Sequence, residues 1–512
     1  MDIGRFVFYS LLGITSAIVY FVLDVWKKKK KTYCRLPPGP QGWPIVGNLF
    51  QLGKKPHESL FRLATKYGPL MSLSLGMKTT VVVSSPSMAK EVLKTHGHVF
   101  AGRIVTQAAR SLSHDKSSFL LCQYGSRWRT LRRISNTELF SVKRLDALQD
   151  LRRVQVRGMI HQIFENSVKG SGCVNIGHIA FHSAFNLIGN MAFGKDMFDP
   201  HFRASEDLKD AISKLMVLHT APNLADYFPC LQFLDLQGVY RNTGIYRKKA
   251  YDVMDKFIED RLAKRGKNSD RTDDGKKDLL DVLLDMRSDE FTLTDIRGYL
   301  NDMFVAGSDT TAVTIEWAIA ELVRNPEKLK RAQAELEEVI GLNRRLEESD
   351  TERLPYLRAV VKEVFRLHPA GPLLVPHRAD GRFEIAGFVI PKHSRVLVNV
   401  WGMGRDPQIW NEPLKFVPER FIDDEMCGQM DYKGKDFELI PFGAGTRMCV
   451  GLPLASRMVH LVLGSLIHSF EWAPPKGMSA EQMDMTEKFG LALQKAVPLE
   501  AIATPRLLSH VY

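Results

Sequence analysis

The sequence predicts a mainly α fold with a small β-sheet region (α+β). We expect one large domain with a long central helix, preceded by one transmembrane helix. Three observations predict this fold. A mostly helical apolar pattern runs from Ser87 to Lys94 and on through Lys330, short strand patterns flank it, and an uncharged apolar segment opens the chain. With 512 residues, 45% hydrophobic, and no repeat or break in composition, the chain can bury one large core.

The N-terminal segment is the expected membrane anchor. Phe6 to Leu23 holds eighteen residues without a charge, which is just sufficient to span a bilayer core, and Lys27 to Lys31 place the following chain in the cytosol. A cleaved secretory signal is the alternative, but here the basic residues follow the apolar run and no small-x-small site closes it. We therefore expect an anchor over residues 1–26, a basic and proline-rich hinge over 27–40, and a single domain over 41–512.

Charge and cysteine usage exclude several classes of function. The net charge is +12, but five of these charges form the lysine run after the anchor, which anionic lipid would attract. No basic stripe interleaved with aromatic residues is present, which argues against binding of nucleic acid. The six cysteines have neither paired nor CxxC spacing, so a disulfide framework and a zinc site are disfavoured and a reducing, cytosol-facing domain fits best.

Short strands are expected on both sides of the helical body. Leu70 to Leu75 and Thr79 to Val83 alternate or run apolar around Gly76-Met77-Lys78, which is typical of a hairpin. Further strands are expected around Phe383 to Ile390 and Arg395 to Val400.

The long central helix is predicted by a cap, an apolar stripe and a stop. Thr292-Leu293-Thr294-Asp295 can cap a helix of about 30 residues that ends before Asn325-Pro326. Midway, Ala306-Gly307-Ser308-Asp309-Thr310-Thr311 inserts small and polar residues into the stripe. Glycine costs a helix interior up to about 1 kcal/mol, so something should compensate. For Thr310, a hydroxyl bonded back to the carbonyl one turn earlier is the plain alternative.

The clearest chemistry lies in the loop from Phe437 to Gly451. Cys449 comes directly before a helix whose first N–H groups have no internal partner, so a thiolate there gains hydrogen bonds and a favourable dipole. Arg447 adds a permanent positive charge beside the sulfur. Tight turns and close approach to a flat ligand are allowed by glycines at 443, 445 and 451. Such a sulfur suits a soft or redox-active metal; a buried structural cysteine is the alternative.

Two pairs of residues stand at helical spacing. Trp128 and Arg132 share one helical face, where an indole N–H and a guanidinium can hold a carboxylate; an arginine packed on a surface tryptophan is the alternative. Glu363 and Arg366 would gain only about 0.2–0.5 kcal/mol as an exposed pair. A further motif later in the chain is more informative than this pair alone, namely Arg420 in the stretch Pro418-Glu419-Arg420-Phe421.

These motifs together resemble the cytochrome P-450 family of haem-thiolate monooxygenases, from the hinge to about Leu499. The resemblance implies haem b, with Cys449 as the axial ligand of the iron, pushing electron density towards dioxygen. The cofactor-binding residues that it implies are Trp128, Arg132, His377, Phe442, Gly445, Arg447, Cys449 and Gly451. The central helix is expected to kink over the distal face, where Asp309 and Thr310 would relay protons. Glu363, Arg366 and Arg420 would form a buried charge network under the haem.

The resemblance also bears on the substrate. Stretches such as Asp226-Tyr227-Phe228-Pro229 are similar to plant microsomal members, above all to the group of geraniol hydroxylases and ferruginol synthases. The implied pocket residues are Met303, Phe304, Ala306, Gly307, Leu373, Leu374 and Phe489. Their apolar character favours a terpenoid. A benzylisoquinoline-alkaloid or phenolic hydroxylase, or a coupling enzyme, stays open as the alternative.

The function implied is a monooxygenase that inserts one atom of dioxygen into a C–H bond of a small apolar plant metabolite. NADPH would supply electrons through NADPH–cytochrome P-450 reductase, and the enzyme would sit in the endoplasmic reticulum membrane as a single-pass protein with its catalytic domain in the cytosol. Two other interpretations stay open: a thiolate-haem isomerase or dehydratase that needs no reductase, and a non-catalytic membrane-tethered haem-binding protein. The residues Asp309 and Thr310 speak against the isomerase.

Two residues of the cysteine loop bear on how strongly the reductase would bind. Thr446 stands where arginine is common in plant members, and Val450 where proline is common, so some positive potential is lost. Arg127, Arg129 and Arg133 form either a basic surface for an acidic redox partner or a solvated face.

Overall fold

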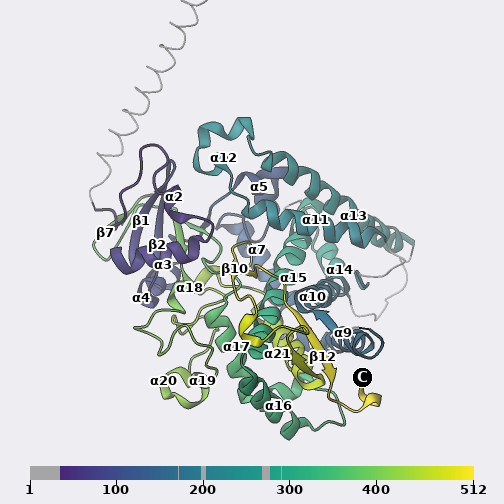
Figure 1. The fold of residues 1–512 in the computed structure, drawn as a ribbon. Coiled ribbons are helices and arrows are strands. Elements are labelled where there is room, and N and C mark those ends of the chain that lie inside the picture. Colours follow the sequence, from purple (N-terminus) through teal and green to yellow (C-terminus); the bar gives the residue numbers. More distant parts are fainter. Residues whose placement is uncertain (1–34, 171, 198–202, 268–276, 290) are drawn as a thin grey trace, which may run out of the picture.

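The computed structural model describes residues 35–170, 172–197, 203–267, 277–289 and 291–512 (Figure 1). The expected anchor over residues 1–26 and the lysine run after it lie outside the described residues. Among the helices in the described ranges, none combines the length and the apolar character needed to span a bilayer. The described chain is mainly helical with small sheets, as the sequence predicts.

The central helix α15 (Leu293–Arg324) is continuous over 32 residues and crosses the middle of the domain (Figure 1). Its start is fixed by the predicted cap, because Asp295 Oδ2 accepts hydrogen bonds from the backbone N of Thr292 at 2.8 Å and from its hydroxyl at 2.9 Å. It ends where Pro326 opens the next helix.

The structure describes further helices before and after α15 in the chain. They are α2 (Leu49–Leu52), α3 (Pro56–Tyr67), α4 (Pro86–Lys90), α5 (Gln107–Arg110), α6 (His114–Ser117), α7 (Ser126–Ile134), α8 (Val142–Ala147), α9 (Gln149–Lys169), α10 (Ile176–Phe193), α11 (Arg203–Thr220), α12 (Leu224–Tyr227), α13 (Val239–Lys267), α14 (Leu279–Asp285), α16 (Pro326–Ile340), α17 (Pro355–Leu367), α18 (Val400–Met403), α19 (Arg420–Asp423), α20 (Glu425–Gly428) and α21 (Leu452–Ser469).

The largest sheet has five strands in the order β1-β2-β8-β5-β3. These are β1 (Leu70–Leu75), β2 (Lys78–Val83), β3 (Gly102–Arg103), β5 (His377–Arg378) and β8 (Arg395–Val398). The predicted hairpin is confirmed, with Leu70 opposite Val83 and Leu75 opposite Lys78. The strand expected to reach residue 400 is shorter than predicted, because the Asn399 side chain accepts from Gly402 N at 3.0 Å and caps α18.

Three smaller sheets are also found among the described residues. They pair β6 (Phe383–Ile385) with β7 (Phe388–Ile390), β10 (Glu487–Lys488) with β11 (Gln494–Lys495), and β12 (Glu500–Pro505) with both β4 (Cys173–Asn175) and β9 (Phe470–Ala473). Strands β3 and β4 interrupt the region expected to be helical. With two and three residues they are too short to leave an alternating pattern.

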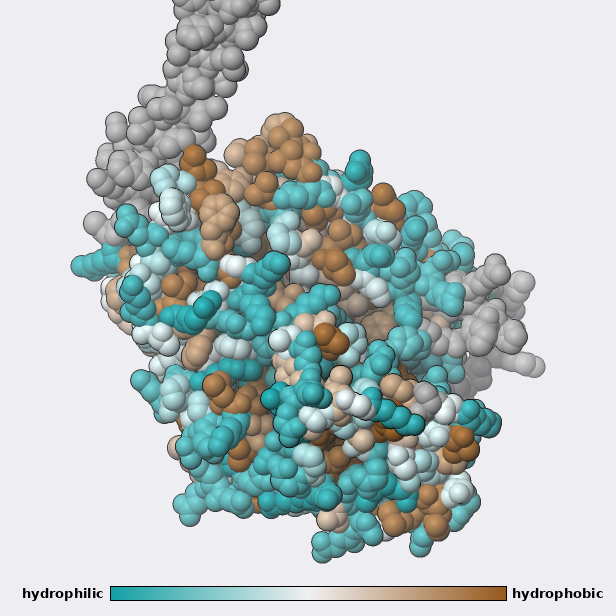
Figure 2. Space-filling model, in the orientation of Figure 1, coloured by the Kyte–Doolittle hydropathy of each residue, from teal (hydrophilic) through white to brown (hydrophobic). Residues whose placement is uncertain are grey.

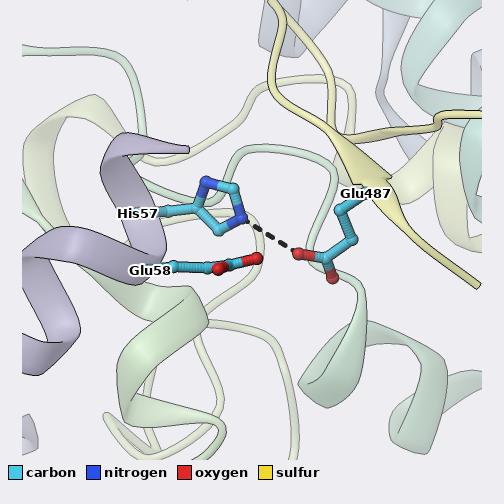
Figure 3. Close-up of side chains that lie close together, drawn as sticks. All are labelled: His57, Glu58 and Glu487. Carbon is cyan, nitrogen blue, oxygen red and sulfur yellow. Dashed lines mark hydrogen bonds and ion pairs between the residues drawn. The ribbon is translucent and has the colours of Figure 1, made fainter. Parts of the chain in front are cut away.

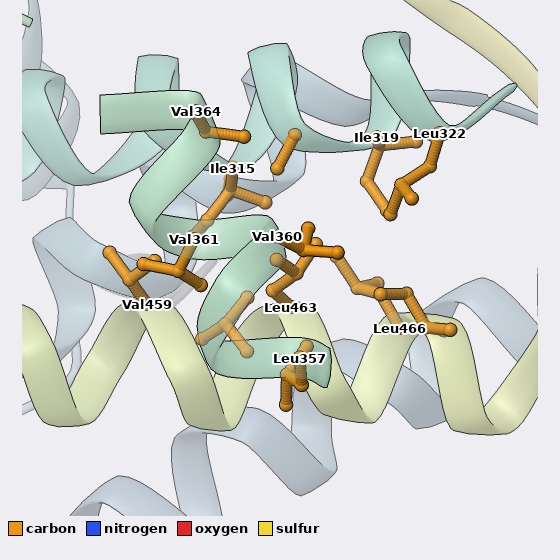
Figure 4. Packing of buried hydrophobic residues seen from close by; sticks show 14 of the residues in the cluster. Ile315, Ile319, Leu322, Leu357, Val360, Val361, Val364, Val459, Leu463 and Leu466 are labelled. Atoms are coloured by element: carbon orange, nitrogen blue, oxygen red, sulfur yellow. The ribbon is translucent and has the colours of Figure 1, made fainter. Parts of the chain in front are cut away.

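The main core lies where α15, α17 and α21 meet (Figure 4). Ile315 and Leu322 of α15, Val360 of α17, and Leu463 and Leu466 of α21 have no more than 1% of their surface exposed. Their close packing fixes α21, and with it the cysteine loop that precedes this helix.

The end of the molecule that carries α12 exposes apolar side chains. Phe233 is 83% exposed and Leu236 58%, and Figure 2 shows hydrophobic residues gathering there. We call the set Leu224, Phe233, Leu234 and Leu236 the apolar tip.

Candidate active site

The cysteine loop is held in a single shape by backbone contacts. The N–H of Cys449 donates to Phe442 O at 2.9 Å, and Gly443 and Gly445 adopt φ of +70° and +66°. A Cβ on Gly445 would lie 1.9 Å from the carbonyl O of Leu93, so only glycine fits there. Gly451 has a φ of −79°, which other residues also adopt, and it stands at the N-cap of α21.

The Cys449 sulfur lies at the start of α21, as predicted. Backbone N–H groups of Gly451 and Leu452 donate to it. Burial nevertheless raises the pKa of the thiol, and these hydrogen bonds and the charge of Arg132 offset only part of that rise. Cys449 nevertheless keeps accessible surface. A metal cation would reverse the balance, since a coordinating thiol is deprotonated.

Cationic groups converge on this loop. Arg132 Nη1 donates to Met448 O at 2.6 Å, and Arg447 donates to Ala101 O at 2.8 Å and to Cys122 O at 2.7 Å. The Arg447 guanidinium also lies over the Trp128 ring, 4.7 Å from its centroid. The structure therefore brings Trp128, Arg132 and Arg447 together, as the sequence predicts.

Arg103 joins this cluster, and sequence reasoning missed it. Strand β3 sets Arg103 directly opposite His377 of β5. Arg103 is 5% exposed, its Nη1 donates to Val375 O at 2.7 Å, and its Nε has no hydrogen-bond partner among the described residues. Burial and the charge of Arg447 lower the pKa of Arg103 to about 9. The only sequence signal was a lone arginine after the apolar Phe100-Ala101, which is weak by itself.

His377 is buried beside these charges. Its Nδ1 lies 2.8 Å from Phe100 O, and burial together with the charges of Arg103 and Arg447 holds its pKa well below the usual range. The nearby Asp380 already pairs with Arg378 at 2.6 Å. The cluster of Arg103, Arg447 and His377 is therefore built to receive an anion from outside the chain.

Helix α15 passes the site with its polar insertion. Thr310 Oγ1 donates to Ala306 O at 2.6 Å, which is the back-bonded arrangement that the sequence left open. The helix does not break at Gly307. Instead, a Cβ there would come 2.6 Å from Ile188 Cδ1, so glycine is compensated by close packing of α10 on α15.

Asp309 is buried, and its hydrogen-bond partner differs from that of Thr310. Gln494 Nε2 of β11 donates to its Oδ1 at 3.1 Å. Burial raises the pKa of Asp309, and the bond from Gln494 offsets part of that rise. A proton is therefore held more tightly at this carboxyl than at an exposed aspartate.

The expected charge network forms. Arg366 donates to both carboxylate oxygens of Glu363 at 2.7 Å, and Arg420 Nε donates to Glu363 Oε1 at 3.2 Å. Glu363 and Arg366 have 0% and 1% of their surface exposed. Arg366 also donates to the carbonyls of Pro413 and Lys415, at 2.7 and 3.0 Å, so the network ties α17 to the segment before the cysteine loop.

The expected pocket residues fall into two groups. Met303, Ala306, Gly307 and Leu374 are partly accessible, and Leu373 packs with Phe489 in one apolar cluster. Phe304 has no accessible surface: its ring lies 4.8 Å from that of Phe185 and 6.0 Å from that of Phe193, within the core. Phe442, also partly accessible, packs edge-on against Phe365 at 5.1 Å.

A cysteine at a helix start, a long helix with a buried carboxyl, and an anion-ready cationic cluster define a haem-thiolate enzyme. Residues 37–499 match the family model for cytochrome P450, so the chain belongs to the cytochrome P450 family. It is a cytochrome P450 monooxygenase that binds haem b and takes its electrons from a reductase.

The chain is similar to plant enzymes over nearly its whole length. The chain is 44% identical to cytochrome P450 76T24 of Catharanthus roseus, over 98% of this chain and 99% of the relative. It is 45% identical to geraniol 8-hydroxylase of Swertia mussotii, over 95% of this chain and 96% of that relative. A solved zebra fish cytochrome P450 with abiraterone is 28% identical, with a TM-score of 0.71 over 88% of this chain and 100% of that one.

Proposed function

We propose that this protein hydroxylates a small terpenoid at a C–H bond. The observation that carries the proposal is the end-to-end similarity to geraniol 8-hydroxylase, at 45% identity for the enzyme of Swertia mussotii and 44% for that of Catharanthus roseus. Similarity to a geranylhydroquinone 3''-hydroxylase of Arnebia euchroma, at 43%, points to the same class of prenyl-derived substrate.

The residues present fit haem b. Cys449 supplies the soft sulfur donor for the iron, and Arg103, Arg447 and His377 supply charge and hydrogen bonds for the propionates, with Trp128 and Arg132 beside them. The partnerless Nε of buried Arg103 supports this assignment, because a carboxylate would satisfy it. When bound, the haem supplies the activation of dioxygen that C–H oxidation needs.

On the distal side, the chain's own residues hold and deliver protons. Burial raises the pKa of Asp309, so this carboxyl holds a proton more tightly than an exposed aspartate would, and Gln494 fixes the direction of the carboxyl. Thr310 Oγ1 donates its proton to Ala306 O, so its lone pairs remain free to accept a hydrogen bond from water. We assign proton delivery to Asp309 and water positioning to Thr310.

The substrate pocket is assigned to the apolar side chains on this side of α15. Met303, Ala306 and Gly307 come from the helix, Leu373 and Leu374 from the segment after α17, and Phe489 from the turn after β10. Phe304 would support the pocket from behind. A lining of this kind excludes water and offers few hydrogen bonds, which suits a prenyl-derived substrate.

We further propose that the protein is anchored in the endoplasmic reticulum membrane, with residues 1–26 as the anchor and 27–40 as the hinge to a catalytic domain over 41–512 in the cytosol. The exposed apolar tip supports contact with lipid. The reductase would dock on the surface where Arg129 and Arg133 are exposed. Arg127 contributes less, because it pairs with Asp295.

The test uses microsomes that hold the full chain with and without a plant cytochrome P450 reductase. Geraniol and NADPH should give a hydroxylated product only when the reductase is present. Product without reductase would favour an isomerase or dehydratase. Oxidation of 7-ethoxycoumarin but not of geraniol would favour a phenolic substrate, since the chain is also 42% identical to a 7-ethoxycoumarin O-deethylase of Helianthus tuberosus.

A further inference from the structure

A buried polar cluster lies away from the cysteine loop, where β10 meets α3 and α18 (Figure 3). Glu487 of β10 and His57 of α3 point at each other, and His57 Nε2 lies 2.9 Å from Glu487 Oε2. Glu58 stands beside them, and potential ligand atoms of the three residues lie within 4.8 Å of one another. That spacing alone would suit a metal ion.

The partners of Glu487 point to a different role. Trp401 Nε1 donates to its two oxygens at 2.9 and 3.1 Å, and Arg405 Nη2 donates to Oε1 at 3.2 Å. Arg405 therefore already neutralises the carboxylate, and the indole N–H has no lone pair to give a metal. Glu58 is engaged as well, with Lys55 at 2.9 Å. The cluster is a satisfied carboxylate network, which we call the Glu487 network.

The Glu487 network reaches helix α15 through a second histidine. His368 Nδ1 lies 3.4 Å from Glu487 Oε1, while its Nε2 lies 2.7 Å from Glu321 Oε1 of α15. The His368 ring also stacks on Trp317 of α15, with centroids 3.9 Å apart. His57, His368, Glu487 and Arg405 are each no more than 8% exposed, so these contacts are shielded from water and from salt.

The second strand of the same hairpin is fixed independently. Leu493 O in front of β11 accepts from Trp317 Nε1 at 2.8 Å, and Gln494 donates to Asp309 at 3.1 Å. Strands β10 and β11 pair Glu487 with Lys495 and Lys488 with Gln494. Both strands are thus tied to the body of the enzyme, and the turn between them carries Phe489, a residue of the proposed pocket.

His57 contacts this turn twice. It binds Glu487, and its ring stacks on Phe489 two residues later, with centroids 5.5 Å apart and planes at 14°. Phe489 packs in the cluster that contains Leu373. Since a carboxylate only accepts, the His57 Nε2 carries the proton and donates it to the hydrogen bond. The side chain of His57 therefore fixes both Glu487, which precedes the turn, and Phe489, the aromatic residue within it.

We propose that His57 is a positioning residue: by holding Glu487 and Phe489 together it fixes the β10–β11 turn and sets which carbon of the substrate is presented for oxidation. The proposal rests on the proposed function, in which Phe489 lines the pocket. His57 itself touches neither substrate nor cofactor, so its effect is transmitted through Phe489. We expect it to govern substrate affinity and product ratio more than the maximal rate.

The test compares three full-length variants. His57→Leu removes both contacts, His57→Gln restores an N–H donor without the ring, and Lys488→Ala changes an exposed side chain on the same strand as a matched control. Hydrogen exchange of residues 485–496 is followed by mass spectrometry without substrate. In His57→Leu we expect exchange about tenfold faster, as for the loss of one hydrogen bond to a charged group. His57→Gln should return it towards wild type, and Lys488→Ala should not change it.

With geraniol as the probe, His57→Leu should raise KM about tenfold, change kcat less and alter the ratio of products. Unchanged hairpin exchange and an unchanged product ratio in a fully haem-loaded His57→Leu protein would overturn the proposal. Haem loss in that variant that His57→Gln fails to reverse would overturn it too, because His57 would then serve folding alone. The hydrogen-exchange measurement needs no substrate. If the wild-type protein is inactive on geraniol, the proposed substrate class is refuted, and the hydrogen-exchange result still decides the role of His57.

Discussion

Cys449 and Cys427 are both cysteines whose thiol pKa is raised by burial, yet only Cys449 also receives N–H groups from a helix start. Cys427 instead lies beside Asp424, whose charge disfavours a thiolate further. We expect Cys449→Ser to lose the red-shifted Soret band of a thiolate-ligated haem after reduction with dithionite and addition of carbon monoxide. Cys427→Ser should keep it. A normal band in Cys449→Ser would mean that another residue ligates the iron.

Two glycines with left-handed backbones allow strain and steric overlap to be separated. Gly445 and Gly341 have φ of +66° and +77°, but only at Gly445 would a Cβ meet another atom, 1.9 Å away. Gly341→Ala should therefore lose only the backbone term of about 1 kcal/mol in the free energy of unfolding. Gly445→Ala should in addition displace the loop from Leu93 and lower the haem content per mole of protein. Equal losses in both variants would show that the loop tolerates the added methyl group.

Asp309 gives a prediction for pH. Because burial raises its pKa, the folded protein holds this proton more tightly than the unfolded chain, whose aspartate has a pKa of about 3.9. The contribution of the protonated carboxyl to stability is thus present at low pH and lost as pH rises through the folded pKa. In urea unfolding between pH 4 and 8, the free energy of unfolding of Asp309→Asn should increase relative to that of wild type as pH rises. A pH-independent difference would contradict the raised pKa of Asp309.

At the scale of elements, the Glu363 network joins α17 to the segment before the cysteine loop. Glu363→Ala leaves Arg366 and Arg420 buried without their carboxylate, which should cost about 3–5 kcal/mol and leave little haem-loaded protein. The matched control is Asp150→Ala, which breaks an i, i+3 pair with Arg153 whose side chains are 76% and 58% exposed. That change should cost less than about 1 kcal/mol. Normal haem content in Glu363→Ala would remove the network from the assembly of the site.

The sequence predicted those elements whose start or end is marked by neighbouring residues. The Thr292 cap with Asp295, the Leu70–Val83 hairpin and the cysteine before α21 are each encoded within a few neighbouring residues. Arg103 was not predictable in this way, because a two-residue strand carries no period and its partner His377 lies far along the chain. The same holds for the contact of Gly307 with a side chain of α10, which lies far from it in the sequence.

At the scale of the whole molecule, the site depends on long-range closure. Arg447 donates to Ala101 O across 346 residues of sequence, and the carbonyls of two distant segments hold its guanidinium over Trp128. These residues lie far apart in the sequence, and only the fold brings them together. The motifs of the sequence therefore predicted the cysteine loop and the charge network, whereas the partner of each side chain had to come from the structure.

The apolar tip provides the last prediction, because Cys230 lies beside it and is exposed. If lipid covers Phe233 and its neighbours, an environment-sensitive dye on Cys230 of the full-length protein should emit at shorter wavelength on vesicles, and lipid-borne quenchers should dim it. The control places the dye on α20, which lies at the opposite end of the molecule from α12 (Figure 1), through Met426→Cys in a Cys230→Ser background; Met426 is 67% exposed. Equal responses at both positions would mean that the anchor alone brings the protein to the membrane. A response confined to Cys230 would mean that lipid meets the domain at the tip, which leaves the side with Arg129 and Arg133 open to the reductase.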